Sequence, residues 1–425
     1  MTDRLKVYAV CTFAIDYAGA ANRAFFQRLL FLSQRHRLVL LTLGRNRGGW
    51  PGAEAMEVRR YPAEPTAMRG GSLAHLLRWW FACRFAVWCL FILRKEAWGQ
   101  GTVVHTFQNT DAVIGYLAKR LGCLWVADCL DMPDLYDEYV QTMKAKRKYL
   151  TAVLLGWGYF KLLGMRRIFR HADVVITTAL TTEEGFARRL IDEYGVDPEK
   201  LVLTTNGTSL GLSTKTGGEP AGRGRRERGR PFRLLYVGSV CRERGVEVLL
   251  AAMAILREAG ITGVVLDLVG PVARGYAPAL EEAARRRQLN GGVNVRGFLP
   301  HPQALDLIEK ADVCLFPFPP GPALDGVMPI KVYEYLAMGK IVVASDLVGV
   351  RSIIRDGVNG LLVRPDDPAD LAAAVRRLWE DDRLYQSLQQ AAAKSVEPFE
   401  WSRVHERLDQ SLMANLLNRG LLSNR

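Results

Sequence analysis

The sequence lacks the cysteine spacing on which metal sites and disulfide frameworks depend. Its 425 residues include seven cysteines, an odd number, and no two of them form a CxxC pair. Neither a zinc site nor a disulfide framework is therefore indicated. A long apolar run near the start is also missing, since MTDRLKVYAVCTFAID has too short an apolar core for a signal peptide. We expect a cytoplasmic protein.

Acidic residues are too few to balance the basic ones. The chain has 44 Asp and Glu against 57 Lys and Arg, which gives a formal net charge of +13. A charge of this size favours a polyanionic neighbour such as nucleic acid, an anionic membrane surface or a phosphorylated substrate. The Arg-rich stretch 213–230 has no interleaved aromatic side chains for base stacking, so we expect no nucleic acid partner.

The dinucleotide-binding pattern GxGxxG is absent, although the first half opens like a Rossmann-like domain. Residues 4–11 and 36–43 are expected to form buried strands, and a small-residue turn at 16–23 opens a helix that runs to about Arg35. Small residues there would let the backbone approach a ligand closely. An ordinary tight turn is the alternative.

Polar residues follow along the next expected strands. Candidate ligand contacts are His105 in one strand, and Asp128 and Asp131 around the end of the next. Open parallel sheets bind ligands at the carboxyl ends of their strands, and a structural role for His105 is the alternative. The remaining expected elements of this half are strands at 102–106, 173–178 and 200–205, a strand end followed by an acidic loop at 124–131, and a helix near 111–121.

Two segments combine basic and aromatic residues. Segment 72–98 contains four tryptophans, but its longest uncharged run, Phe85 to Leu93, is far shorter than the roughly 20 residues that span a bilayer. Segment 144–170 begins with a basic run and continues with an apolar, aromatic stretch. Either segment could be covered by the sheet or could insert aromatic side chains into a membrane interface.

The stretch 211–231, rich in Gly and Arg, predicts a flexible linker between two domains. On this basis the chain divides into an N-terminal domain at 1–210, a C-terminal domain at 232–398 and a final amphipathic helix at 399–425 that returns to the first domain. Strands and helices alternate in the second domain, which predicts a parallel sheet. The expected strands are 233–238, 264–269, 293–296, 312–316, 341–344 and 360–363, and the helices are 246–258, 277–288, 302–310, 329–338, 349–355 and 369–380.

The stretch 326–346, GVMPIKVYEYLAMGKIVVASD, joins a loop, a short helix and a buried strand. Pro329 at the helix start and Gly339 past its end fit the usual asymmetry of helix termini. The first turn of such a helix can hold a phosphate. Glu334 is the one carboxylate between Asp325 and Asp346, so it is the candidate for holding sugar hydroxyls. An ordinary surface helix is the alternative.

Four pieces of the second half resemble the nucleotide-sugar domain of the family-4 retaining glycosyltransferases. They are LLYVGSVCRERGVEVLLAAM at 234–253, LDLVGP at 266–271, VRGFLPHPQALDLIEKADVCLFPF at 295–318 and MPIKVYEYLAMGKIVVASDLVGVRSIIRDGVNGLLV at 328–363. The first half matches more loosely, through VVHTFQ, ADCLDMPD, HADVVITTA and TTNGTSL. The resemblance implies the GT-B fold, an α/β architecture of two Rossmann-like domains facing across a cleft.

The resemblance also assigns roles to residues. Arg244 matches the second residue of a basic pair that holds the diphosphate, while Ser239 stands at the first position, so that cation is missing or is supplied by Arg242. Glu334 matches the second carboxylate of a Glu-x7-Glu motif; Gly326 replaces the first, and Asp325 is a possible substitute.

Lys331 belongs to the variant motif PxKxxEY and is a candidate replacement cation. The full set of implied residues comprises His105, Arg244, Lys331 and Glu334 as catalytic, Asp128 and Asp131 on the acceptor side, and Gly19, Ala20, Gly238, Ser239, Arg242, Gly270, Gly297, Phe298, Asp325, Gly326, Val327, Met328 and Pro329 around the donor.

The expected activity is retaining transfer of a sugar from a UDP- or GDP-linked donor to a hydroxyl acceptor. The basic-aromatic segments favour a lipid-linked or membrane-proximal glycan acceptor in surface polysaccharide synthesis, with peripheral binding at the cytoplasmic face of a membrane. No cofactor and no metal are expected, because the cations named above can neutralise the leaving diphosphate. A nucleotide-sugar epimerase of the same architecture and a non-catalytic binding scaffold are the alternatives.

Overall fold

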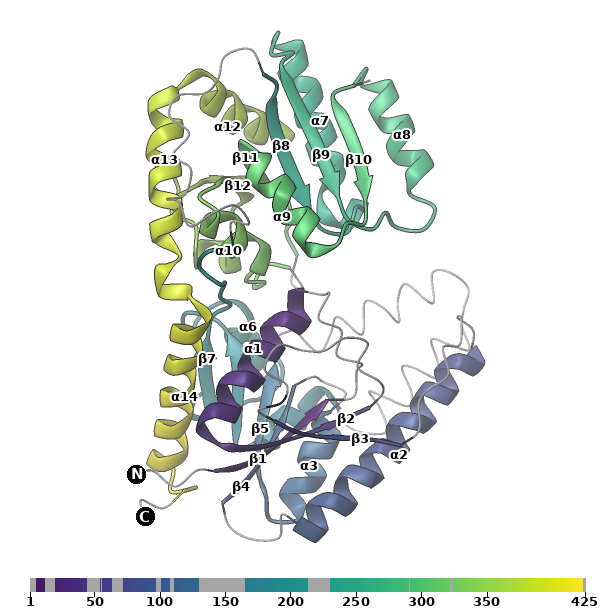
Figure 1. The fold of residues 1–425 in the computed structure, drawn as a ribbon, viewed down its shortest axis with the longest axis vertical. Coiled ribbons are helices and arrows are strands. Elements are labelled where there is room, and N and C mark those ends of the chain that lie inside the picture. Colours follow the sequence, from purple (N-terminus) through teal and green to yellow (C-terminus); the bar gives the residue numbers. More distant parts are fainter. Residues whose placement is uncertain are drawn as a thin grey trace. The chain divides into compact units, whose positions relative to one another are not determined.

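The structure is a computed structural model that describes residues 5–11, 20–43, 54, 56–62, 72–96, 101–107, 111–129, 165–212, 230–289, 291–321 and 324–422. The chain forms two compact units (Figure 1). Unit 1 comprises Met1–Thr205 with Val404–Arg425, and unit 2 comprises Asn206–Arg403. Each is built on its own parallel β-sheet.

The described part of unit 1 holds a seven-stranded parallel sheet in the order β3-β2-β1-β4-β5-β6-β7. Its direction of winding reverses between β1 and β4, which lie side by side although β2 and β3 separate them in sequence. The strands are β1 Lys6–Cys11, β2 Arg37–Thr42, β3 Glu57–Arg60, β4 Thr102–Thr106, β5 Leu124–Cys129, β6 Val174–Thr178 and β7 Leu201–Thr204.

Side-chain alternation along the strands divides the core of unit 1 into two layers. Val7 and Ala9 of β1 pack on one face with helix α1 (Ala20–Arg35) and the last helix α14 (Trp401–Asn418). Tyr8 and Val10 pack on the other face with α2 (Ser72–Glu96) and α3 (Ala112–Arg120). Figure 1 shows α1 and α14 on one side of this sheet and α2 and α3 on the other. Both faces are covered, so the central strands are mostly apolar.

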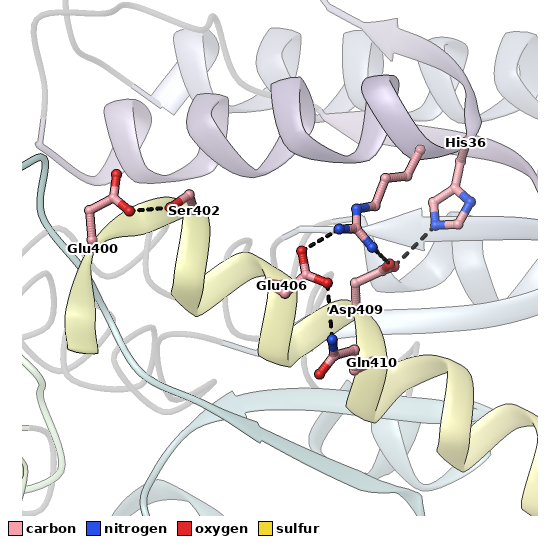
Figure 2. Close-up of polar contacts among 7 residues, drawn as sticks. His36, Glu400, Ser402, Glu406, Asp409 and Gln410 are labelled. Carbon is pink, nitrogen blue, oxygen red and sulfur yellow. Dashed lines mark hydrogen bonds and ion pairs between the residues drawn. The ribbon is translucent and has the colours of Figure 1, made fainter. Parts of the chain in front are cut away.

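Polar contacts fix α14 onto the end of α1 (Figure 2). The guanidinium of Arg35 donates to the carboxylate of Glu406 and contacts Asp409 at 3.4 Å. His36 lies 3.1 Å from the same Asp409. Leu408, Leu412 and Leu416 of α14 are buried in the core of unit 1. The final helix thus contributes an amphipathic face to the sheet that begins the chain.

The described part of unit 2 holds a six-stranded parallel sheet in the order β10-β9-β8-β11-β12-β13, which reverses between β8 and β11. The strands are β8 Phe232–Val237, β9 Val264–Val269, β10 Val293–Gly297, β11 Val313–Phe316, β12 Ile341–Ser345 and β13 Leu361–Val363. The helices are α7 Val246–Glu258, α8 Ala277–Arg286, α9 His301–Lys310, α10 Ile330–Ala337, α11 Val348–Arg351, α12 Pro368–Glu380 and α13 Asp382–Ser395. Buried apolar residues from β8, β9, β11, β12 and β13 form one continuous core, and the partly buried Val293 of β10 packs against it.

Two expectations for unit 2 need correction. The helix expected at 349–355 is the short α11, because Asn359 accepts from the backbone N–H of Arg355 and holds the chain in a turn instead. Helix α13 was not expected from the sequence; Asp381 caps it by accepting from the N–H groups of Arg383 and Leu384.

Helix α2 occupies the first basic-aromatic segment. Neither α2 nor any other described helix is long and apolar enough to cross a membrane. Of the second basic-aromatic segment, residues 144–164 lie outside the described part of the chain, as does most of the expected linker.

Candidate functional site

Three glycines follow or end neighbouring strands of unit 2 and bring their backbones close together. The N–H of Gly238, just after β8, donates to Val269 at 2.8 Å, and the N–H of Gly270, just after β9, donates to Gly297 at 2.8 Å. Gly270 has φ +139°, and a Cβ there would lie 1.9 Å from the carbonyl oxygen of Gly238. Only glycine fits such an approach. The result is an open backbone edge at the carboxyl ends of β8, β9 and β10.

Two cations from different elements meet beside this edge, over the same aromatic ring. The guanidinium carbon of Arg244 lies 4.6 Å from the ring centroid of Phe318, and Nζ of Lys331 lies 5.3 Å from it. Lys331 Nζ also lies 5.2 Å from the Tyr236 ring. A Cβ on Gly238 would approach Lys331 Nζ to 2.4 Å, so the ammonium lies directly against the glycine turn. Aromatic faces stabilise the charges.

Arg244 and Lys331 lie at the switch point of the sheet of unit 2, which is the point where its direction of winding reverses. Gly238 follows β8 and Phe318 follows β11, the two central strands between which the winding reverses. Open α/β sheets bind their ligands in the crevice outside the carboxyl ends of such strands. The sequence-predicted Arg244, Lys331 and Gly238 are therefore brought together where a ligand is expected.

Burial depresses the basicity of Lys331. Desolvation and, to a smaller extent, the neighbouring positive charge of Arg244 lower its pKa to about 7, while the charge of Glu334 acts in the opposite direction. Among the residues that the structure describes, Lys331 forms no ion pair with a carboxylate. An anionic ligand beside Lys331 would stabilise its charged form.

Helix α10 presents Glu334 one turn after Lys331. The side chain of Glu334 is only 13% exposed, and its Oε1 lies 3.2 Å from Nε2 of His301, the first residue of α9. The helix is held against the sheet because the Tyr335 hydroxyl accepts from the N–H of Val237 at 3.1 Å. The carboxylate of Glu334 and the ammonium of Lys331 are therefore both carried by α10, which the hydrogen-bonded Tyr335 holds against the end of β8.

The loop before α10 is fixed by its own hydrogen bonds. Oδ1 of Asp325 accepts from the N–H of Val348 at 3.2 Å, and its carbonyl accepts from Gly349 at 2.7 Å. The side chain of Asn206 donates to the carbonyl of Met328 at 2.6 Å. Asp325 therefore ties the loop to α11, and Gly326, Val327 and Pro329 are held between these anchors.

Three further predicted donor residues differ in their surroundings. Ser239 is exposed, and its carbonyl accepts from the Tyr236 hydroxyl at 2.9 Å. Arg242 is 75% exposed, and its nearest recorded carboxylate is Glu247 at 4.0 Å. Lys331, not Arg242, lies against Gly238. Phe298 is 66% exposed beyond the end of β10.

In unit 1, His105 and Asp128 lie on adjacent strands inside the protein. His105 is 2% exposed and stacks on Phe107 with ring centroids 4.1 Å apart. Its Nε2 lies 3.7 Å from Asp128, whose carboxylate forms a buried ion pair with Arg28 of α1. Desolvation lowers the pKa of His105, which keeps the ring neutral. Both residues stand one position before the end of their strands, β4 and β5, and form a buried polar cluster with Arg28 of α1.

Gly19 and Asp131 lie outside the described residues, and Ala20 is the first residue of α1. In the described part of the chain, groups of three or more His, Cys, Asp or Glu side chains placed to hold a metal ion were not found.

The sequence analysis did not single out His301, Tyr236 and Phe318, although each contacts a predicted site residue. His301 follows Pro300 where a helix begins after a strand, and the two aromatic residues flank strand ends in apolar runs. Apolar runs predict burial and carry no signal of a ligand, which is why the aromatic residues were missed.

Two family models match the chain. The model described as "Glycosyl transferases group 1" covers residues 231–381, and "Glycosyl transferase 4-like domain" covers residues 31–207. The D-inositol 3-phosphate glycosyltransferase of Thermomonospora curvata is 30% identical over 332 residues, 75% of this chain and 73% of the relative. The chain belongs to the family-4-like glycosyltransferases.

Solved structures agree on the fold of this glycosyltransferase. Sucrose-phosphate synthase from Thermosynechococcus elongatus matches with a TM-score of 0.72 at 20% identity, over 98% of this chain and 100% of that one. HepE from Anabaena, solved with UDP, matches with a TM-score of 0.67 at 17% identity, over 96% and 100% of the two chains. The architecture is GT-B, two Rossmann-like α/β domains, as the sequence predicted.

Proposed function

We propose that this glycosyltransferase moves a sugar from a UDP- or GDP-linked donor to an acceptor hydroxyl with retention at the anomeric carbon. The observation that carries the proposal is the pair Arg244 and Lys331, which share the ring of Phe318 beside the glycine turns of unit 2. Two cations at the switch point of a parallel sheet match the charge of a diphosphate.

The remaining site residues take roles that follow from this placement. Lys331 replaces the cation that Ser239 does not provide, and Glu334 accepts from ribose hydroxyls of the nucleotide. The glycine turns let the backbone approach the diphosphate. Arg244 and Lys331 stabilise the negative charge that develops on the departing diphosphate, so we expect the reaction to need no metal.

The transfer step follows from this electrostatic arrangement. The acceptor hydroxyl forms the new glycosidic bond on the face from which the nucleoside diphosphate departs, as the bond between the anomeric carbon and the diphosphate oxygen breaks. The proton of the hydroxyl passes to the departing diphosphate oxygen. The protein contributes positioning and charge stabilisation and needs no covalent nucleophile.

We further propose that the acceptor is a lipid-linked or membrane-proximal glycan of surface polysaccharide synthesis and that the enzyme binds peripherally at the cytoplasmic face of a membrane. The support is the outer face of α2, where Trp80 is 46%, Val87 68% and Phe91 66% exposed. The basic side chains Arg84, Arg94 and Lys95 are exposed on the same helix. A helix of this composition suits an anionic interface.

The transfer itself is tested with a panel of UDP- and GDP-sugars. Acceptors include lipid-linked glycans and, because of the relative named above, D-inositol 3-phosphate. We expect acceptor-dependent release of the nucleoside diphosphate and a product whose anomeric configuration, read by NMR coupling, equals that of the donor. A product of opposite configuration would refute retention, and sugar epimerisation or release without an acceptor would favour the epimerase alternative.

A further inference from the structure

His301 contacts Glu334, but the roles proposed above for the donor site do not include His301. The ring lies at the first position of α9, and its Nε2 is 3.2 Å from Oε1 of Glu334 on α10. Both side chains are partly buried, at 27% and 13% exposure. Helices α9 and α10, which follow different strands, are therefore joined by a polar contact at the edge of the site.

The backbone around His301 is restricted. Pro300 precedes it as the N-cap residue, with φ −56° and ψ 148°, and Pro302 follows it in the first turn of α9. Proline fixes its own φ and also limits the residue before it, so the ring starts from a rigid platform. The carboxylate of Glu334 lies at the end of a side chain with several rotatable bonds, and the contact with His301 restricts its orientation.

We infer that His301 is a positioning residue, which donates a hydrogen bond from Nε2–H to Oε1 of Glu334 and so orients the carboxylate for the ribose hydroxyls of the donor nucleotide. This inference rests on the proposed function. Because Gly326 occupies the place of the other carboxylate of the family motif, the site depends more heavily on Glu334 being held in one orientation. His301 itself touches no reacting atom in this role.

The test compares ribose recognition in matched variants. Isothermal titration measures the dissociation constants of UDP, 2′-deoxy-UDP and 3′-deoxy-UDP, or of the GDP series where the wild type prefers GDP. His301→Phe keeps a ring of similar size but removes the donor, and His301→Gln keeps a donor without the ring. We expect His301→Phe to lose most of the preference for the ribonucleotide, roughly tenfold for a charge-assisted hydrogen bond, and His301→Gln to retain it.

A double-mutant cycle with Glu334→Ala isolates the coupling. In the Glu334→Ala background the change His301→Phe should have no further effect, since its action passes through that carboxylate. Thermal unfolding of each variant shows whether the fold persists. Full ribose preference in His301→Phe, or effects that simply add, would overturn the inference while leaving the donor site intact. An unchanged ribose preference in Glu334→Ala would instead overturn the role proposed for Glu334, and the inference with it.

Discussion

At the scale of single residues, Lys331 is the cation that we propose in place of the basic residue expected at Ser239. The loop after β8 carries Ser239 where a basic residue is expected, and α10 places Lys331 Nζ against Gly238 in the same loop. The site keeps two cations, but one of them is buried among Tyr236, Phe316 and Phe318. That burial, which lowers the pKa of Lys331 to about 7, makes the charge of the site depend on pH.

Donor affinity should therefore decline as the pH rises. With a pKa of about 7 in the free protein, Lys331 is charged below that pH and loses its proton above it. A bound diphosphate favours the charged form, so binding takes up a proton above pH 7, and the dissociation constant rises by at most about tenfold per pH unit. Lys331→Arg keeps its charge and should show a flatter profile above pH 7, because the guanidinium is not deprotonated.

Titration of UDP or GDP against both proteins from about pH 6 to about pH 9 makes the comparison, and dividing one profile by the other cancels the titration of the nucleotide itself. Parallel profiles for wild type and Lys331→Arg would show that Lys331 does not carry the pH dependence.

The sequence predicts the surroundings of some candidate site residues better than those of others. Arg244, Lys331 and Glu334 stand in motifs whose chemistry is local, and the structure brings Arg244 and Lys331 to one ring. The sequence does not reveal that His105 and Asp128 face a buried arginine, because that contact depends on α1 packing over the sheet. Long-range packing, rather than local propensity, decides which polar strand residues reach a ligand.

At the scale of elements, α2 has two distinct faces. Phe85, Cys89 and Leu93 recur at intervals of four residues and are buried against the sheet of unit 1. Trp80, Val87 and Phe91 recur on the opposite side and are exposed. The sheet covers one face, as the first alternative expects, and the other face carries an exposed apolar stripe whose insertion into a membrane is a proposal.

Removing that stripe should weaken membrane binding without disturbing the core. We expect Trp80→Ser with Phe91→Ser to reduce sedimentation with anionic vesicles of phosphatidylglycerol and phosphatidylcholine at low salt by about tenfold or more, since each aromatic side chain contributes apolar area at the interface. Val358→Ser, at a residue 55% exposed in unit 2, is the matched control. Equal sedimentation of the double variant and the wild type, or none by the wild type, would refute the membrane part of the proposal.

At the scale of the whole molecule, the alternation of strands and helices predicted the fold well. Buried parallel strands are nearly continuous apolar runs separated by turn signals, and β8, β9, β12 and β13 lie within about a residue or two of the expected ranges. Helix α13 escaped prediction because it is largely polar, and its place depends on packing against α10 and α12. Local patterns predict the strands and most of the helices of unit 2, and α13 is the helix that depends on tertiary contacts.

The account depends most on one claim, that unit 2 binds a nucleoside diphosphate through Arg244 and Lys331. Isothermal titration of the 425-residue protein with UDP and GDP at pH 6.5 tests it directly. We predict saturable binding of one molecule of at least one of them, weakened about a hundredfold by Lys331→Met and by Arg244→Met, because each loses a charge-assisted contact to the diphosphate. Arg376→Ala, on the exposed side of α12, should bind as the wild type does. Binding of neither nucleotide by the wild type, or full affinity in both charge-removing variants with an intact fold, would contradict the claim.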